Sequence, residues 1–517
     1  MSERFYITTP IYYVNAEPSA GSTYTTVVAD TVARYHRLFG EDTRFLTGTD
    51  EHGDKVAQAA AAFGVTPYEY ATRISDTFRH TWPRFEIQPD DFIRTTEPRH
   101  ARVVQYILQQ VYDKGEIYFG EYGGLYCFGC ERFYTEKELV DGKCPQHLTE
   151  PTYISEKNYF FRMSAYQEWL IRLLEEHPDV VRPDQYRREV LGFLRDPLED
   201  LCISRPTARL TWGIPLPFDQ DYVTYVWFDA LINYVSALGY PDGDLYKQFW
   251  PVAQHVIGKD ILKPHAVYWP CMLQAAGIPI YRHLNVHGYW TMGGQKGSKS
   301  VAAAGALADA MALFRKPLEL VERFGADGAR YVLLREMQFG SDSEFSPQGL
   351  IRRYNADLAH DLGNLANRVI NMTRRYCEGR IPDPPGELDT DRDLRDAAIA
   401  APGAVRAAID AMQPHLALTR AMDLVKMTNG YLEQKAPWSA AKAGDRGSVE
   451  TTLYYAAEAL GVAAALLSPA MPAKMAALRA ALGLPAQPRI GGWGQLDPGV
   501  EVGQLPILFP KIEDPEE

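Results

Sequence analysis

Four residues between positions 127 and 147 have the types and the spacing of a metal site. Cys127 and Cys130 form a C-x2-C pair, and Cys144 and His147 form a C-x2-H pair. Thiolates and imidazoles are the ligands of tetrahedral Zn²⁺, and each short pair supplies two of them from one turn. Because four protein ligands leave no place for a catalytic water, the array predicts a structural zinc site. The alternative is four unrelated residues, two of them buried cysteines.

The surrounding hydrophobic pattern predicts the start of a doubly wound parallel sheet. Residues 5–9 are expected to form a buried strand, followed by a helix from Thr23 to near Gly40 and a second strand at 44–47. In such sheets ligands bind beyond the carboxyl ends of the strands, where residues 10–22 and 48–53 fall. Later strands are expected in three short apolar runs, at 223–227, 255–257 and 285–287.

Changes in composition along the chain suggest a catalytic domain with an insertion, followed by a helical domain. An aromatic, Gly-rich stretch carries the cysteine pairs, and residues 355–481 are rich in Ala and Leu at helical spacing. The expected organisation is a Rossmann-type catalytic domain at 1–115 and 201–300, an insertion with a zinc knuckle at 116–200, a connecting region at 301–354, a helical domain at 355–490 and a tail at 491–517.

The composition is that of an ordinary folded protein. With 517 residues the chain should form two to four domains, and its net charge of -13 argues against a generic nucleic-acid coat without excluding tRNA. No apolar run approaches the roughly 18 residues of a membrane span, and no signal-peptide pattern is present. We therefore expect a cytoplasmic protein with no membrane partner. The lone Cys202, Cys271 and Cys377 are expected in the core.

Several long segments resemble methionyl-tRNA synthetases. They are Thr8-Thr-Pro-Ile-Tyr-Tyr-Val-Asn-Ala-Glu-Pro18, Thr47-Gly-Thr-Asp-Glu-His-Gly53, Tyr225-Val-Trp-Phe-Asp-Ala230, Gly258-Lys-Asp-Ile-Leu-Lys-Pro-His265 and Lys296-Gly-Ser-Lys-Ser300. The resemblance extends to Lys511 and implies a class I catalytic domain, a zinc-bearing connective peptide, a stem-contact region and a helical anticodon-binding bundle. The dimerisation module that many bacterial relatives add is not expected here, so we expect a monomer.

The resemblance also implies a methionine site. Asp50, at the end of a strand, would bind the ammonium group of the amino acid. Aromatic rings suit the thioether through sulfur–ring contacts of about 0.3–1.5 kcal/mol. The side chains that the resemblance assigns to this site are Ile11, Tyr13, Trp227, Ala230, Tyr234 and His265. Taken alone, Trp227 and Tyr234 are more typical of core residues, and it is the matching order of the motifs that favours the pocket.

The ATP signatures depart from the family. The His-x-Gly-His motif is replaced by Ser19-Ala-Gly-Ser22, which keeps Gly21 but lacks both imidazoles. Loss of one such preorganised donor typically costs about 10²–10³ in rate. The lysine motif keeps Lys296 and Lys299 as phosphate ligands beside Mg²⁺, although a solvated lysine pair is the alternative. The resemblance adds Asp260 to the ATP site.

An anticodon face is implied in the helical domain. Asn364 and Arg368 lie four residues apart, hence on one helix face, and Trp438 follows Ala436-Pro437 near a helix start. The resemblance assigns these three to reading a CAU anticodon, by stacking and by hydrogen bonds to splayed bases. An ion-paired Arg368 and a core Trp438 are the alternatives.

Three functions fit these residues. The first is activation of L-methionine by ATP and transfer to tRNA(Met), weakened by the loss of both histidines. The second is an impaired paralogue that binds methionine or tRNA without turnover. The third is an amino-acid-activating enzyme of secondary metabolism, which would have no need of the anticodon residues.

Overall fold

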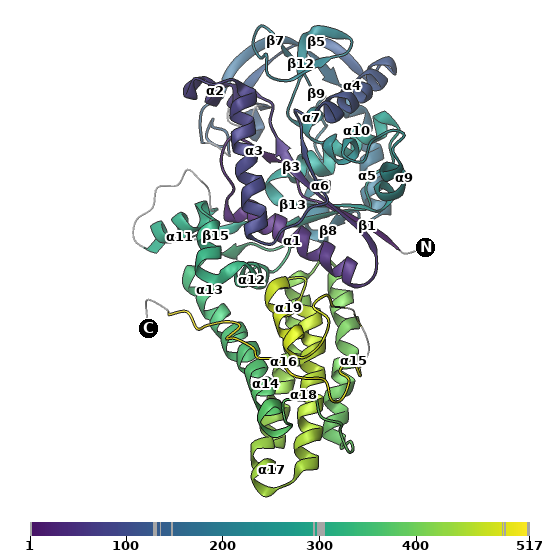
Figure 1. The fold of residues 1–517 in the computed structure, drawn as a ribbon. Helices are drawn as coiled ribbons and strands as arrows, with labels where there is room; N and C mark the ends of the chain where they lie inside the picture. Colours follow the sequence, from purple (N-terminus) through teal and green to yellow (C-terminus); the bar gives the residue numbers. More distant parts are fainter. Residues whose placement is uncertain are drawn as a thin grey trace.

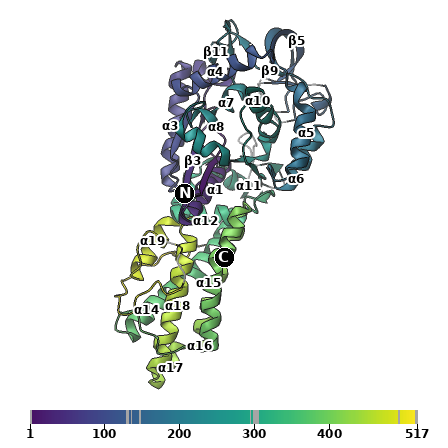
Figure 2. The ribbon, with the colours of Figure 1, turned by 90° about the vertical axis from the view of Figure 1, so that its right-hand side faces the viewer.

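The computed structural model describes residues 3–127, 132–134, 136–145, 148–292, 295–296, 306–488, 490 and 493–513. Figure 1 shows an elongated molecule in which a part containing the sheets lies above a helical bundle. Figure 2, turned by 90°, shows the same two parts, with α17 (Pro437–Ala443) at the end of the bundle far from the sheets. None of the described helices combines the length and apolarity needed to cross a bilayer.

The predicted parallel sheet is confirmed, in the order β2-β3-β1-β13-β14-β8 with β4 also paired to β3. Its strands are β1 (Arg4–Thr8), β2 (Tyr12–Tyr13), β3 (Asp42–Asp50), β4 (Asp91–Arg94), β8 (Val181–Arg182), β13 (Ala253–Gly258) and β14 (His283–His287). The ladders are parallel throughout, and β1 lies between β3 and β13. The second strand is longer than predicted and ends on Asp50 itself.

Helices of very different lengths surround this sheet. They are α1 (Ala20–Leu38), α2 (Asp54–Phe63), α3 (Pro67–Arg84), α4 (Pro98–Asp113), α7 (Trp227–Ala230), α8 (Asn233–Ser236), α9 (Asp244–Phe249), η3 (Trp250–Val252), η4 (Lys259–Ile261), the π-helix η5 (Pro264–Tyr268) and α10 (Trp269–Ala276). Most of α1 is buried, because it lies between the sheet and the helical bundle, where Tyr35 Oη donates to Leu466 O at 2.8 Å.

The strand predicted at 223–227 is partly wrong. Strand β12 (Asp219–Thr224) ends at Thr224 and belongs to a small antiparallel sheet with β10 (Arg205–Pro206) and β11 (Ile214–Leu216). Val226 then has a φ of 58°, which turns the chain out of extended structure, and helix α7 follows directly. The aromatic and β-branched residues that favour a strand here instead pack around this turn.

A second antiparallel sheet forms most of the predicted insertion. Its order is β6-β5-β7-β9, with strands β5 (Ile117–Cys127), β6 (Arg132–Tyr134), β7 (Thr152–Phe161) and β9 (Leu201–Cys202). The 3-10 helices η1 (Glu136–Glu138) and η2 (Met163–Tyr166) and helices α5 (Gln167–Glu176) and α6 (Asp184–Phe193) accompany it. Within the same stretch, Val181 and Arg182 pair with β14, so the chain returns briefly to the edge of the parallel sheet.

The rest of the chain connects the sheets to the bundle and then builds it. The connecting elements are β15 (Trp290–Met292), β16 (Gln295–Lys296), α11 (Ala306–Arg315), α12 (Leu318–Glu336), β17 (Ser343–Glu344) and α13 (Pro347–Arg353). The bundle comprises the π-helix η6 (Tyr354–Gly363), α14 (Asn364–Tyr376), α15 (Asp389–Asp410), α16 (Pro414–Lys435), α17, α18 (Arg446–Leu467) and α19 (Pro472–Ala481). The tail, predicted to be extended at 505–511, runs along η6, where Asn355 and Ile512 exchange two hydrogen bonds.

One buried arginine joins the two parts. The Arg330 guanidinium lies 2.8 Å from the Asp30 carboxylate, and both side chains are fully buried. The same guanidinium donates to Phe85 O, Pro469 O and Ala470 O. Helices α1 and α12 and the turn between α18 and α19 are therefore held by one charged group, which fixes the bundle against the sheet.

Candidate active site

The residues assigned to the methionine site come from five elements, β2 with the residues just before it, β3, α7, α8 and η5. Tyr13 pairs with Asp50 through the β2–β3 ladder, which places both at the carboxyl end of β3. Trp227 begins α7, and its ring lies 6.3 Å from that of His265 in η5. Ala230 ends α7, Tyr234 lies in α8, and Ile11 packs against the same core cluster as these rings.

A hydrogen bond joins Tyr234 to His265. His265 Nδ1 donates to Ile261 O at 2.9 Å, so its Nε2 accepts from Tyr234 Oη at 2.8 Å. Burial lowers the pKa of His265 to about 4 and raises the pKa of Tyr234 above its ordinary value. Both side chains are therefore neutral at physiological pH. A neutral aromatic wall suits a thioether, which would gain nothing from a charged one.

Tyr234 is also a core residue. Its side chain is 1% exposed, and its ring lies 4.1 Å from His255 and 6.0 Å from Trp269. Trp227 is less buried and only partly packed against the core. Tyr234 is therefore held deep in the protein, as a core residue is. Trp227 keeps part of its surface accessible, as a residue that contacts a ligand would.

A buried carboxylate that the sequence did not single out, Asp229, lies in α7 between Trp227 and Ala230. Asp229 Oδ2 is 2.6 Å from His52 Nδ1, and Asp229 Oδ1 is 2.7 Å from His100 Nε2. Burial alone would raise the pKa of Asp229, but His52 and His100 outweigh it and hold that pKa below its ordinary value. His52 lies in the motif at 47–53 and Asp229 in the motif at 225–230, so their ionisable side chains could have been singled out from the sequence. His100 lies in no recognised motif, and nothing in the sequence pointed to it.

The altered ATP signature forms the first turn of α1. Ser19 is the N-cap, and Ser22 Oγ accepts from the Ser19 N–H at 2.9 Å and donates to Ser19 O at 3.0 Å. A serine hydroxyl carries one hydrogen, and Ser22 uses it within the turn. Gly21 leaves room beside the helix, since a Cβ there would first meet Phe314 at 3.6 Å.

The lysine motif lies partly outside the described residues. Lys296 ends β16, whose backbone pairs with Thr291 of β15, so the motif begins in a hairpin rather than in a loop directly after β14. Lys299 is not among the described residues. Helix α11, which follows the motif, brings Phe314 back over Gly21, so the chain after the lysines returns to the first turn of α1.

Asp260 lies in η4, directly after β13, and is exposed. A Cβ on Gly258 would come within 2.6 Å of the Asp260 carboxylate and 3.4 Å of His287. A side chain at position 258 would therefore displace the Asp260 carboxylate, so glycine here leaves room for that carboxylate at the carboxyl end of β13. This edge of the sheet is where a doubly wound fold binds its ligands.

Half of the predicted zinc array can be located. Cys127 ends β5, and Cys144 belongs with it and Tyr134 to one small buried cluster, in which Cys144 Sγ is 3.5 Å from Tyr134 Oη. Cys130 and His147 lie outside the described residues. Within the described ranges, no three His, Cys, Asp or Glu side chains are grouped to hold a metal.

Two of the three predicted anticodon residues, Arg368 and Trp438, meet at the far end of the bundle. Arg368, in α14, lies over the Trp438 ring at 5.3 Å and forms an ion pair with Glu433 at 2.8 Å. Ala436 has a φ of 44°, and this sharp turn between α16 and α17 brings Trp438 beside α14. Asn364, one turn before Arg368, is exposed. Trp438 is half-buried, so it is not a core residue.

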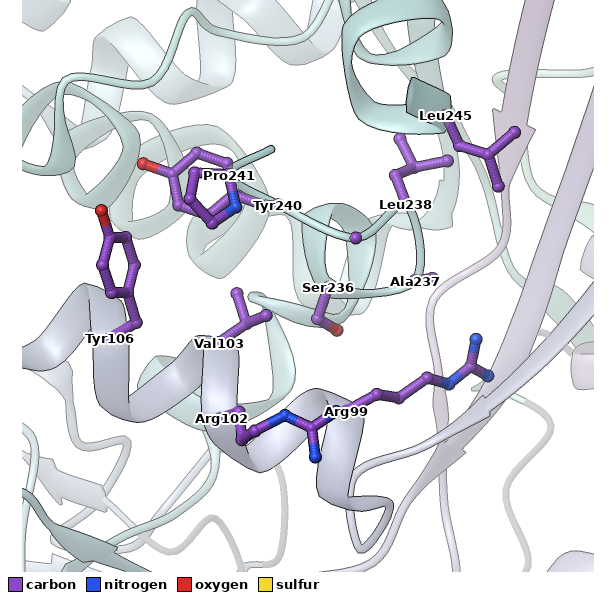
Figure 3. Close-up of a pocket in the computed structure, with 11 residues that line it drawn as sticks. Arg99, Arg102, Val103, Tyr106, Ser236, Ala237, Leu238, Tyr240, Pro241 and Leu245 are labelled. Carbon is purple, nitrogen blue, oxygen red and sulfur yellow. The ribbon is translucent and has the colours of Figure 1, made fainter. Parts of the chain in front are cut away.

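A further pocket, of about 520 Å³, lies between α4 and the turn at 239–241 and contains none of the predicted site residues. Figure 3 shows Arg99, Arg102 and Tyr106 on its α4 side and Tyr240 and Ser236 opposite. Ser236 Oγ is 2.8 Å from His100 Nδ1, so the wall of this pocket touches the histidine that binds Asp229.

Comparison with known proteins matches the whole chain to one kind of enzyme. The family model described as "tRNA synthetases class I (M)" matches residues 5–155 and 147–370. A methionine--tRNA ligase of Deinococcus radiodurans is 44% identical, covering 98% of this chain and 74% of its own length. That of Streptomyces coelicolor is 39% identical, with 99% and 97% covered. The structure of Mycobacterium tuberculosis methionyl-tRNA synthetase in complex with methionyl-adenylate superposes with a TM-score of 0.92 at 38% identity, covering 98% of this chain and 100% of that one.

Proposed function

The chain belongs to the methionyl-tRNA synthetase family of class I aminoacyl-tRNA synthetases, and from that membership we propose that it activates L-methionine with ATP and transfers it to tRNA(Met). The observation that carries the proposal is the neutral, hydrogen-bonded pair of Tyr234 and His265 beside the Trp227 ring. A carboxylate, Asp50, stands at the carboxyl end of β3, where it pairs with Tyr13 of the same proposed site. Together these groups match the two ends of methionine, an apolar thioether and an ammonium.

The reaction needs positioning more than a protein nucleophile. The methionine carboxylate attacks the α-phosphorus of ATP, pyrophosphate leaves, and the 3′-terminal ribose hydroxyl of tRNA then attacks the adenylate carbonyl and releases AMP. In this proposal Asp50 binds the ammonium, and the Trp227, Tyr234 and His265 rings hold the side chain. Lys296 and Lys299, with Mg²⁺, neutralise the phosphate charge. Correct placement of both reactants accounts for much of the rate in such reactions.

We further propose that the ATP half of the reaction is weakened. In the family an imidazole at each end of the motif donates to the phosphates, whereas here Ser22 donates its hydrogen to Ser19 O. A serine in that arrangement has no second hydrogen for a phosphate. A catalytically impaired relative that binds methionine or tRNA is therefore the second candidate function, and this hydrogen bond is the observation that favours it.

A structural zinc ion is part of the proposal. Cys127 and Cys144 belong to one small buried cluster, which is compatible with two ligands of one tetrahedral site, and Cys130 and His147 would complete the set. Bound zinc would supply folding energy to the knuckle. Metal analysis should find about one zinc per chain, and a Cys144→Ala variant should lose it, whereas Cys377→Ala, in a buried cysteine of the bundle, should keep it. A zinc-free wild-type chain would contradict the proposal.

The partner proposed for the helical bundle is tRNA with a CAU anticodon. Support comes from the stacked Arg368 and Trp438, which offer a cation and a half-buried ring at the end of the molecule. Base–aromatic stacking of this kind contributes about 1–3 kcal/mol per base.

Methionine-dependent ATP–pyrophosphate exchange tests the function. The wild-type chain is compared with a Ser19→His, Ser22→His variant and with a matched Ser19→Gln, Ser22→Gln variant, which adds bulk without a cation. Slow wild-type exchange that rises in the histidine variant alone supports the proposal. No exchange by the wild-type chain or by the histidine variant, with binding of CAU tRNA retained, would establish the binding paralogue instead. Exchange with another amino acid in place of methionine would point to an activating enzyme of secondary metabolism.

A further inference from the structure

The two sides of the methionine site belong to different segments, and the short segment on one side is not stable in its conformation by itself. Asp50 ends the long strand β3, whereas Trp227 and Ala230 lie in α7, a helix of four residues. So short a helix is not stable by its own hydrogen bonds. Val226, which precedes it, has a φ of 58°, a costly conformation for a β-branched residue. Contacts with the rest of the protein must therefore fix α7.

Asp229 makes the contacts that do so. It lies in α7 between Trp227 and Ala230, it is fully buried, and each of its oxygens is hydrogen-bonded to a different histidine. His52 follows Asp50 by two residues, and His100 lies in the first turn of α4. A buried carboxylate is costly unless its partners are well placed, so its geometry is sharply defined. One carboxylate thus joins the end of β3, α4 and α7.

The two histidines are themselves held, and for His100 the partner is Ser236, whose Oγ lies 2.8 Å from His100 Nδ1. The His52 ring lies 5.2 Å from the Trp212 ring, and the Trp212 indole N–H donates to Glu51 O. Glu51 in turn forms a buried ion pair with Arg94 at 2.7 Å. Neither histidine can therefore follow a displaced Asp229 without disturbing further buried bonds. The distance between the two sides of the site is set by a rigid frame.

We propose that Asp229 is a positioning residue for methionine, which holds Trp227 and Ala230 at a set distance from Asp50 through its bond to His52. Asp229 contacts neither substrate in this proposal, and it acts only through the residues on either side of it. The inference rests on the proposed function, because it assumes that Asp50 and Trp227 bind opposite ends of one methionine. ATP, on the first turn of α1, should be indifferent to it.

An Asp229→Asn variant tests the inference, because it keeps the shape of the side chain but removes its charge and one acceptor. Misplacement by about an ångström can cost on the order of a hundredfold. We expect the methionine Kd and KM to rise at least tenfold while the KM for ATP stays within twofold.

The matched control is Asp391→Asn. Asp391 is as buried, and it bonds to Tyr431 and Lys435 at 2.7 Å, but it lies in the helical bundle. Its loss should lower thermal stability without changing methionine affinity. If Asp229→Asn behaves in the same way, with lower stability and an unchanged methionine KM, Asp229 is merely structural and the inference is overturned.

A second pair of variants decides the matter if Asp229→Asn does not fold. His52→Asn places an amide N–H where His52 Nδ1 donates, whereas His52→Leu has a similar size and no donor. We expect His52→Asn to bind methionine at least threefold more tightly than His52→Leu. Equal affinities would overturn the role of this hydrogen bond.

Calorimetric titration of the wild-type chain with methionine distinguishes a failure of the proposed function from a failure of the role proposed for Asp229. A wild-type chain that binds no methionine overturns the proposed function, and the role of Asp229 falls with it. A wild-type chain that binds methionine, beside an Asp229→Asn variant of equal affinity, overturns the role of Asp229 alone.

Discussion

Burial of His265 should make the protein sensitive to mild acid, and a His265→Gln variant should lose part of that sensitivity. The pKa of His265 is lowered from 6.5 to about 4 by burial, so the native chain keeps it neutral where the unfolded chain is protonated. Below pH 6.5 the unfolded state therefore binds more protons than the native state. The stability that the neutral ring contributes is complete above pH 6.5 and is lost as the pH falls towards 4.

The size of the effect follows from the same two values. One pKa unit corresponds to about 1.36 kcal/mol, so the native state should lose about 2 kcal/mol between pH 7.5 and pH 5.0 through His265 alone. His255, His283 and His287 also have pKa values lowered by burial, and they add to the slope in both proteins. The comparison with the variant removes their contribution, provided that His255, close to His265, titrates alike in both.

Urea denaturation followed by tryptophan fluorescence, at pH 7.5 and 5.0, measures the effect. At pH 7.5 the variant should be less stable, because the bonds of His265 to Tyr234 and Ile261 are altered. Between the two pH values the wild-type chain should lose about 2 kcal/mol more than the variant. Two proteins with parallel pH dependence would refute the claim that His265 is buried and neutral.

Three further outcomes are expected. Gly21→Ala should leave the melting temperature unchanged or slightly raised, since a Cβ meets nothing closer than 3.6 Å. The same variant should raise the KM for ATP in pyrophosphate exchange. An unchanged KM for ATP would mean that no nucleotide approaches this backbone. Asp30→Asn should cost about 3–5 kcal/mol in urea denaturation, because Arg330 is left buried without its counter-charge; a cost below about 1 kcal/mol would contradict that account. Trp438→Ala should weaken binding of CAU tRNA by about 1–3 kcal/mol in a filter-binding assay. Trp438→Phe should bind this tRNA with an affinity closer to that of the wild-type chain, and neither variant should change methionine binding. Equal tRNA affinity of the wild-type chain and both variants would show that Trp438 is not part of the interface.

Local patterns were sufficient for the elements whose signal lies in adjacent residues. The strands at 5–9, 255–257 and 285–287 and the helix after Thr23 are recovered within a few residues, because burial on both faces of a parallel sheet leaves continuous apolar runs. The pairing of Asn364 with Arg368 on one helix face also follows from spacing alone. The segment 225–227 was misjudged, because a single backbone dihedral at Val226 overrides the β propensity of its neighbours.

What the sequence by itself determined is the family, the order of the elements and the residue types brought to the sheet edge. Only the tertiary structure decided how those side chains are used. Ser22 donates its hydrogen to its own turn, His265 is neutral, and Asp229 joins two histidines separated from it by 177 and 129 residues. The physical reason is that burial and hydrogen-bond partners set the charge and the available donors of a side chain, and both depend on segments that meet only in the folded chain.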